Sequence, residues 1–376
     1  MRDVLPELLA WWNAGATVGV ATVVGTWGSA PRQPGATMLV GPDGSVVGSV
    51  SGDCVEADLH EVTQAVVASG VPSLQRYGMT GSDAYAVGLS CGGTIDVFIE
   101  RVSQASYPDL ADLAAAVCDG RSVAVATVIE HPVTDRVGRR LIIEAESPEP
   151  SGTTGSAQAD AAIGEDARGM LAAGRTGLLT YGPDGECQGD GMRVFVASHT
   201  SPPRMLIFGA IDTAAAVATL ATFVGYRVTV CDARPLFATR ARFPQADEVV
   251  VDWPHRYLAS QQEHRAIDGR TVVCVLTHDP KFDVPVLEVA LRLPEVAYVG
   301  AMGSRRTHDE RLLRLREAGL TNAELTRLFS PIGLDLGAQT SEDTAVSIIA
   351  EVISHRCGGQ GGRLTELTGR IHRQSS

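Results

Sequence analysis

The sequence is short of positive charge and of long apolar runs. Lysine and arginine together number 31 against 44 aspartates and glutamates, a net charge of −13. Nucleic acids and anionic membrane surfaces both attract basic proteins, so this balance argues against either as a partner. No stretch of about 18 apolar residues occurs, so no transmembrane helix is expected.

Several familiar sequence signals are also missing. The first residues, MRDVLPELLAWWNAG, have no basic segment followed by an apolar one, and they predict an amphipathic helix rather than a signal peptide. Seven scattered cysteines form neither a disulfide framework nor a Cys-x-x-Cys pair, which predicts a reducing cytoplasm and no structural zinc. The chain has no iron–sulfur cysteine run, no P-loop and no Gly-x-Ser-x-Gly elbow.

The composition indicates a folded protein of two parts. With 376 residues, 44% hydrophobic and 20% charged, the chain is long enough for two cores. Ser201-Pro202-Pro203 is its best linker signal. We therefore expect an N-terminal domain over 1–200, a C-terminal domain over 203–357 and a flexible tail over 358–376. No internal repeat is detected.

The N-terminal part predicts an α/β domain rich in strands. A turn at 41–44 predicts a hairpin, and a helix is expected from Cys54 to about Ser69. The segment 147–164, rich in Ser, Thr, Gly, Pro and Ala, predicts an exposed, mobile loop. The other expected elements are strands at 18–24, 94–101, 122–129, 140–145 and 193–197, and a helix at 110–118.

The C-terminal part alternates apolar runs with helix-length segments. This order predicts a parallel sheet with helices on both faces, a Rossmann-like α/β domain. The expected strands are 205–208, 227–231, 248–251, 271–276 and 297–299, and the expected helices are 213–224, 284–292 and 309–318.

A phosphate-binding turn is predicted after the first of these strands. Gly209 stands where the chain reverses, Ala210 follows it, and Ala214 stands where the helix meets the sheet. Ile211 occupies the place of the usual second glycine, and its side chain is expected to crowd a pyrophosphate. Tight binding of NAD or NADP is therefore not expected.

An acidic residue closes the next strand, 23 residues after Gly209. Asp232 is near the spacing of a ribose-binding acid, and Arg234 suits a phosphate. The alternative is that both residues only end a strand and solvate a loop. The first reading predicts that Gly209 and Asp232 face one crevice.

Two cysteines stand in glycine-rich turns. Cys54 follows Gly52-Asp53, and Cys91 precedes Gly92-Gly93. A cysteine at a helix start can have a lowered pKa, although Asp53 would raise that of Cys54. We expect both on one face of the N-terminal domain, turned toward the crevice of the Rossmann domain. Small buried residues are the alternative, and we interpret most of the other five cysteines as packing.

Two further segments follow strands of the C-terminal domain. His278 and Asp279, with Asp283 and His308, are candidates for a metal site, but their spacing matches no standard site, and capping is the alternative. Gly303, Ser304, Arg305 and Arg306 can grip a phosphate or, alternatively, begin a helix with Ser304 as its cap.

Several motifs together resemble the XdhC/CoxI family. The N-terminal matches are Gly28-Ser29-Ala30-Pro31-Arg32-Gln33-Pro34-Gly35-Ala36, 48–58 and 91–100. The C-terminal matches are 206–235, 277–283, 298–306 and 331–338. The family usually has Gly-Gly-Cys where Gly52-Asp53-Cys54 stands, Gly-x-Gly where Gly209-Ala210-Ile211 stands, and commonly a histidine at Asp212.

The resemblance implies an accessory factor for molybdenum hydroxylases such as xanthine dehydrogenase or carbon monoxide dehydrogenase. Such a factor binds the molybdenum–pterin cofactor, with or without an attached nucleotide, assists its sulfuration and inserts it into the apoenzyme. It is a maturation chaperone rather than an enzyme, although the name xanthine dehydrogenase is given by association. The resemblance places Cys54 or Cys91 near the molybdenum, and implies an apoenzyme, a cysteine desulfurase and a second copy of the chain as partners.

Two other interpretations stay open. A nicotinamide-dependent oxidoreductase would use the Rossmann domain for NAD or NADP, and Ile211 argues against it. A structural component of a molybdoenzyme assembly is the third.

Overall fold

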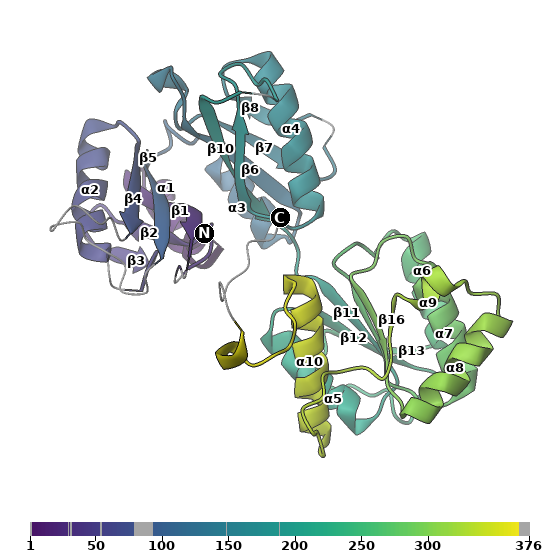
Figure 1. Cartoon of the computed structure of the whole chain (residues 1–376). Helices are drawn as coiled ribbons and strands as arrows, with labels where there is room; N and C mark the ends of the chain where they lie inside the picture. Colours follow the sequence, from purple (N-terminus) through teal and green to yellow (C-terminus); the bar gives the residue numbers. More distant parts are fainter. Residues whose placement is uncertain are drawn as a thin grey trace. The chain divides into compact units, whose positions relative to one another are not determined.

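The computed structural model describes residues 2–28, 30, 32–52, 55–78, 93–147, 149–187 and 189–367. The chain divides into two compact units, which meet in sequence at Ser201 and Pro202 (Figure 1). Each unit is described by itself. No helix in the described part of the chain is both long and apolar enough to cross a membrane.

Unit 1 contains two five-stranded antiparallel sheets with the same strand order. The first sheet is ordered β3-β2-β1-β5-β4 and the second β8-β7-β6-β10-β9. The first set of elements is η1 (Arg2–Val4), α1 (Leu5–Asn13), β1 (Val18–Trp27), β2 (Thr37–Val40), β3 (Val46–Gly48), α2 (Glu56–Ser69), β4 (Ser73–Gly78) and β5 (Thr94–Val102). The second is α3 (Leu110–Cys118), β6 (Val123–Glu130), η2 (Thr134–Arg136), β7 (Arg140–Glu144), β8 (Ser151–Thr153), α4 (Ala157–Ala172), β9 (Gly177–Tyr181) and β10 (Met192–His199).

Unit 1 is therefore a structural duplication. In each copy a helix is followed by three antiparallel strands, a second helix and two more strands. Both long first strands carry the sequence Val-Ala-Thr-Val, at 20–23 and at 125–128. The ladder register skips one residue at the same place in each, Val24 and Ile129. The expectation of no internal repeat was wrong, because the copies share fold and turn geometry but only short stretches of sequence.

The two sheets pack face to face. Helix α2 covers one face of the first sheet through Leu59 and Val66, and α4 covers one face of the second through Ile163 and Leu171. The opposite faces meet in a cluster built from both copies, whose buried members are Val24, Phe98, Ile129 and Phe195. Helices α1 and α3 share a further cluster with strands of both sheets.

Equivalent glycines test the duplication. Gly48 and Gly152 have φ values of 82° and 85°, and a Cβ at either would collide with a backbone carbonyl oxygen, that of Thr37 or of Arg140. We expect Gly48→Ala and Gly152→Ala each to lower the free energy of unfolding by about 2–4 kcal/mol, because left-handed strain adds to overpacking. Denaturant melts measure this effect.

Gly120 supplies the control for these variants. Its φ is 72°, but a Cβ there meets no atom within 4 Å. Gly120→Ala should therefore cost only about 1–2 kcal/mol, the strain alone. Equal losses at all three glycines would contradict the collision at the two equivalent positions.

Two further expectations were wrong, one for unit 1 and one for cysteines of both units. The segment 147–164 is not a loop, because it contains β8 and the first half of α4, with Ala159 and Ile163 buried. Among the five cysteines interpreted mostly as packing, only Cys231 and Cys274 are buried, whereas Cys118, Cys187 and Cys357 are exposed.

Unit 2 confirms the predicted parallel sheet, in the order β13-β12-β11-β14-β15-β16. Its strands are β11 (Arg204–Phe208), β12 (Arg227–Asp232), β13 (Glu248–Val251), β14 (Val272–Val275), β15 (Tyr298–Ala301) and β16 (Leu328–Phe329). Its helices are α5 (Asp212–Phe223), α6 (Pro254–Glu263), α7 (Pro280–Arg292), α8 (Arg305–Glu317), α9 (Asn322–Leu325), α10 (Ser341–Cys357) and η3 (Leu364–Glu366). Together the units confirm the α/β fold class.

Helices cover both faces of this sheet. One apolar cluster joins α5 and α10 to the sheet, and a second joins α6, α7 and α8 to it (Figure 1). The strand order reverses between β11 and β14, since β12 and β13 extend one way and β15 and β16 the other. In such sheets ligands bind beside the carboxyl ends of the strands at this switch point.

Candidate functional site

One candidate site lies in unit 1, in the turn that joins β3 to α2. The carboxylate of Glu56 accepts hydrogen bonds from the hydroxyls of Ser49 and Ser51 at 2.7 and 2.5 Å, and from the backbone N–H of Ser51 and of Gly52 at 2.9 and 3.0 Å. Burial opposes its ionisation, but these bonds outweigh burial and hold the pKa of Glu56 far below its usual value. Glu56 thus fixes the turn over residues 49–52.

The two cysteines themselves lie outside the described residues. Cys54 precedes Glu56 by two positions, and Cys91 precedes β5. Asp53 also lies outside them. The expectation that Cys54 and Cys91 share one face of this domain therefore stays a prediction.

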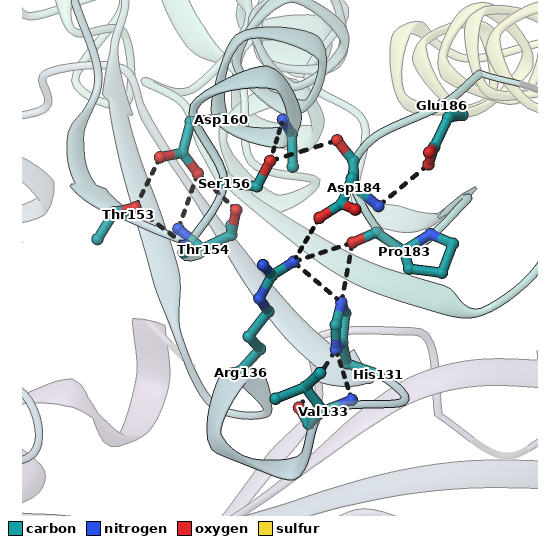
Figure 2. A network of polar contacts seen from close by, with 12 residues as sticks. His131, Val133, Arg136, Thr153, Thr154, Ser156, Asp160, Pro183, Asp184 and Glu186 are labelled. Carbon is teal, nitrogen blue, oxygen red and sulfur yellow. Dashed lines mark hydrogen bonds and ion pairs between the residues drawn. The ribbon is translucent and has the colours of Figure 1, made fainter.

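The second copy shows what an equivalent turn without a cysteine looks like (Figure 2). The carboxylate of Asp160 accepts from the Thr153 hydroxyl and from the Thr154 N–H, both at 2.7 Å. Counting from Gly48 and Gly152, Asp160 takes the place of Glu56, and Gln158 takes the place of Cys54. The second copy therefore keeps the carboxylate that holds the turn and lacks the thiol.

Side chains of the second copy also form a network of hydrogen bonds beside this turn. The guanidinium of Arg136 donates to the Asp184 carboxylate at 3.0 Å and to the Pro183 carbonyl at 3.1 Å, and the Ser156 hydroxyl donates to the Asp184 carbonyl at 3.4 Å (Figure 2). These contacts tie the loop after β9 to the turn before α4.

Removal of the Glu56 charge tests how far it holds the turn. We expect Glu56→Gln to lower the free energy of unfolding by about 1.5–3 kcal/mol at neutral pH, the worth of hydrogen bonds to a charged group. Because the folded-state pKa is lowered, Glu56 contributes stability above its unfolded pKa of about 4.5, and this contribution falls with pH below it. Melts at pH 7 and pH 4 should show a smaller difference from the wild type at pH 4. A constant difference would contradict this role.

The second candidate site lies at the switch point of unit 2. Gly209 has a φ of 114°, and a Cβ there would lie 2.9 Å from the Thr277 nitrogen, so only glycine lets this turn approach the end of β14. The Asp232 carboxylate accepts from the Ala210 N–H at 2.7 Å. Asp232 therefore lies against the turn that begins at Gly209. That the two face one crevice stays a prediction.

Arg234 donates the other hydrogen bonds that the Asp232 carboxylate accepts. Its backbone N–H and its Nε lie 2.9 Å from one Asp232 oxygen, and its Nη2 lies 2.8 Å from the other. Burial opposes the ionisation of Asp232, but these bonds and the bond from Ala210 lower its pKa. A ribose hydroxyl would have to compete with Arg234 for this acid.

The Ile211 side chain does not project freely into solvent. It is half-buried and packs against the apolar cluster below α5. Arg242 lies on the same turn, donating to the Ala210 carbonyl at 3.1 Å and to Asp212 at 2.9 Å. Sequence reasoning missed Arg242, because no motif links it to a turn 32 residues earlier.

Five helices, α5, α6, α7, α8 and α10, begin at this edge of the sheet, and three of them are capped by side chains. Asp279, Ser304 and Thr340 accept hydrogen bonds from the first backbone N–H groups of α7, α8 and α10. Helices α5 and α6 have no side-chain cap, and α6 begins with a proline, which has no N–H to donate. The Thr213 hydroxyl in the first turn of α5 lies 3.2 Å from the Ser341 hydroxyl. The first N–H groups of α5 can therefore serve an anion.

The remaining residues that the sequence offered as site candidates are buried, paired or involved in helix capping, or are exposed without a contact that indicates a ligand. Ala214 is fully buried against the sheet, His278 is exposed, and Asp279 pairs with Lys281 at 3.0 Å. Gly303 precedes the Ser304 cap, and Arg305 is exposed in the first turn of α8. The capping alternatives for Asp279 and Ser304 are correct. No cluster of His, Cys, Asp or Glu within the described ranges is arranged to hold a metal ion.

Asp283, a metal candidate from the sequence, is instead half of a buried ion pair. Its carboxylate lies 2.9 Å from Nη2 of Arg311, and the two side chains are 4% and 2% exposed. Arg311 also donates to the Met302 carbonyl at 2.7 Å and to the Ser330 hydroxyl at 3.0 Å. The pair fixes α7, α8 and the loops after β15 and β16 around the switch-point edge.

Comparison with known proteins assigns both units. A model of the XdhC Rossmann domain matches residues 205–352, and a model of the XdhC and CoxI family matches 11–78 and 116–182, one segment in each copy of unit 1. A protein of Bacillus subtilis described as a probable xanthine dehydrogenase component is 28% identical over 90% of this chain and 92% of its own. The molybdenum cofactor insertion chaperone PaoD of Escherichia coli is 29% identical over 94% and 88%.

A solved structure agrees with these matches. The crystal structure of a xanthine dehydrogenase from Bacillus halodurans superposes with a TM-score of 0.66 at 27% identity, covering 97% of this chain and 98% of the other. The matched proteins therefore contain counterparts of both units in the same order, and the matches cover nearly the full length of the chain. The chain belongs to the XdhC/CoxI family.

Proposed function

We propose that this chain is an accessory factor of a molybdenum hydroxylase, which binds the molybdenum–pterin cofactor, assists its sulfuration and inserts it into the apoenzyme. The observation that carries the proposal is the similarity to a molybdenum cofactor insertion chaperone across both units. The cofactor is cargo here, held and passed on in the cytoplasm. The partners are the apoenzyme, a cysteine desulfurase and a second copy of the chain.

The switch-point turn supplies groups that suit the phosphate of this cargo. The uncapped N–H groups of α5 favour an anion, and Arg234 and Arg242 lie on the same turn. Gly209 and Ala210 allow close approach, and Ala214 lets the helix sit against the sheet. Farther along the edge, Gly303, Ser304 and Arg305 with His278 and Asp279 are the candidates for further polar contacts.

The thiols supply the chemistry that a phosphate site cannot. Resemblance to the family places Cys54 and Cys91 at positions where its members carry cysteines. A thiolate can ligate a metal or hold sulfur in transit. The proposal assigns Cys54 or Cys91 to the molybdenum or its sulfur.

Co-expression with a client tests the proposal. A molybdenum hydroxylase made together with this chain should contain more molybdenum and more active enzyme than the same hydroxylase made without it. Molybdenum content by mass spectrometry and the turnover of the purified hydroxylase are the two measurements. Equal content and turnover in both preparations would refute the role in insertion.

The nicotinamide alternative predicts a different ligand. We expect no micromolar binding of NAD or NADP, because the Asp232 carboxylate is engaged by Arg234 and Ala210 and because Ile211 replaces a glycine of the turn. Isothermal titration calorimetry measures this directly. Micromolar affinity for either dinucleotide would favour an oxidoreductase.

A further inference from the structure

A cavity of 230 Å³ lies inside unit 1, in the interface between the two sheets. Strands of both copies line it, with Thr22 and Phe98 from one sheet and Thr127 and Phe195 from the other. Gly35, Thr176 and Ser198 line it as well and are half-buried, so the cavity reaches the surface there. Its lining includes no residue of the turn before α2.

The duplication explains why polar side chains face this interior. Along β1, Ala21 and Val23 pack toward α2, so Thr22 between them faces the other sheet. Along β6, Ala126 and Val128 pack toward α4, and Thr127 faces inward in the same way. The two threonines occupy equivalent positions of the repeated Val-Ala-Thr-Val sequence.

Three hydroxyls at this cavity take part in no hydrogen bond of normal geometry in the described part of the chain. Thr22 and Thr127 are each 9% exposed, and their hydroxyls take part in none of the hydrogen bonds found there. Tyr107 is 5% exposed, and its buried hydroxyl makes no hydrogen bond of normal length and angle, although the Arg140 guanidinium lies close enough to interact with it. Burial raises the pKa of Tyr107 to about 12, so the hydroxyl is neutral and can both donate and accept. Buried polar groups are nearly always paired, so the Tyr107 hydroxyl points to a bound molecule, and the two threonine hydroxyls face the same space.

Arg140 and Glu100, a pair of zero net charge, line the cavity together with His199. Nη2 of Arg140 lies 2.5 Å from the Glu100 carboxylate, and the side chains are 12% and 15% exposed. The Arg140 guanidinium lies 3.9 Å from the centre of the Tyr107 ring, and its other hydrogen bonds, from Nε and Nη2, go to the Gly138 carbonyl. Nη1 of Arg140 and the second oxygen of Glu100 make no hydrogen bond within the described residues. They leave one donor group and one acceptor for a ligand.

We propose that this cavity binds a small, flat, uncharged heterocycle that carries a cyclic amide. The amide carbonyl accepts from Arg140, and its N–H donates to Glu100. A charged ligand would unbalance the pair in a poorly solvated interior, so a neutral ligand is favoured. A cavity of about 150 Å³ holds benzene, and drug-sized ligands need roughly 300 Å³ or more, so a bicyclic ring suits the volume. The proposal does not depend on the function proposed above.

Calorimetry with matched probes tests this assignment. The full chain should bind 4-quinazolinone, a bicyclic cyclic amide, saturably with one site. Quinazoline, which has the same rings and no amide, should bind at least tenfold more weakly. Absence of saturable binding, or equal binding of both probes, would overturn the proposal.

Variants locate the binding in this cavity. Glu100→Gln and Arg140→Met should each weaken binding of 4-quinazolinone at least tenfold. Each leaves a buried partner without its counter-charge, and folding can suffer, so Thr22→Val and Thr127→Val are the second pair. They remove hydroxyls that have no protein partner, and they should weaken binding several-fold without lowering the melting temperature. Thr180→Val, at an exposed position of β9, is the control. Unchanged affinity in both threonine variants would refute the site.

Discussion

Replacement of Arg311 by methionine is expected to lower the free energy of unfolding by about 3–5 kcal/mol. Arg311 and Asp283 are almost fully buried, and removal of the guanidinium leaves the Asp283 charge without a counter-charge in the interior. The substitution also removes donors from the Met302 carbonyl and the Ser330 hydroxyl. Chemical denaturation of the full chain, followed for the unit 2 transition, measures the loss.

Two matched variants separate charge from packing. Arg306→Met breaks an exposed pair with Glu310 on the same helix, whose side chains are 88% and 45% exposed, and should cost no more than about 0.5 kcal/mol. The double variant Asp283→Leu/Arg311→Met removes both charges and should recover most of the loss. A loss below about 1 kcal/mol for Arg311→Met would contradict the role of the pair.

The pH dependence of Arg311→Met gives an independent readout. Burial raises the pKa of Asp283 even beside Arg311, and removal of Arg311 raises it further. The folded variant then binds a proton more readily than the unfolded chain does, so its stability rises as pH falls through this range. The difference from the wild type should therefore shrink between pH 7 and pH 5. A constant difference would point to packing instead.

Substitution of the two glycine-flanked cysteines should produce the largest functional effect. We expect Cys54→Ser and Cys91→Ser each to reduce retention of the sulfurated cofactor at least tenfold, with little change in stability. A serine hydroxyl is not ionised at neutral pH, so it replaces a thiolate poorly as a ligand of metal or sulfur. Cofactor content is measured by molybdenum analysis and pterin fluorescence after release. Asp53 disfavours a thiolate at Cys54, so the larger effect is expected at Cys91.

The competing outcome for these cysteines has a distinct signature. If they are core residues, each serine buries an unsatisfied hydroxyl and should cost about 1–3 kcal/mol in unfolding free energy. Cys118→Ser and Cys187→Ser, at exposed positions, are the controls and should change neither quantity. Loss of stability with unchanged cofactor retention would refute a site at Cys54 and Cys91.

The parallel domain was predictable because its signals are local. Each strand is a short apolar run, each connection has the length of a helix, and the spacing from Gly209 to Asp232 placed the two at one turn, as the hydrogen bond from Ala210 confirms. The contact of Arg242 with that turn was not predictable, since it depends on how a distant loop folds back.

The duplication and α4 were harder to predict, for different reasons. Helix α4 is rich in alanine and glycine and resembles a loop in composition, although its buried Ala159, Ile163, Ala167 and Leu171 recur every four residues. The two copies share only short sequences, Val-Ala-Thr-Val and the Tyr-Gly pairs 77–78 and 181–182. Their equivalence lies mainly in positive-φ glycines and strand register, which composition does not reveal.

Native mass spectrometry of the full chain, purified from a host that makes molybdenum cofactor, tests the central claim most directly. The account predicts a bound species whose added mass equals the molybdenum–pterin cofactor, alone or with its nucleotide, together with molybdenum in proportion to protein. A chain that carries no added mass and no molybdenum from such a host, or that carries NAD or NADP instead, would contradict it.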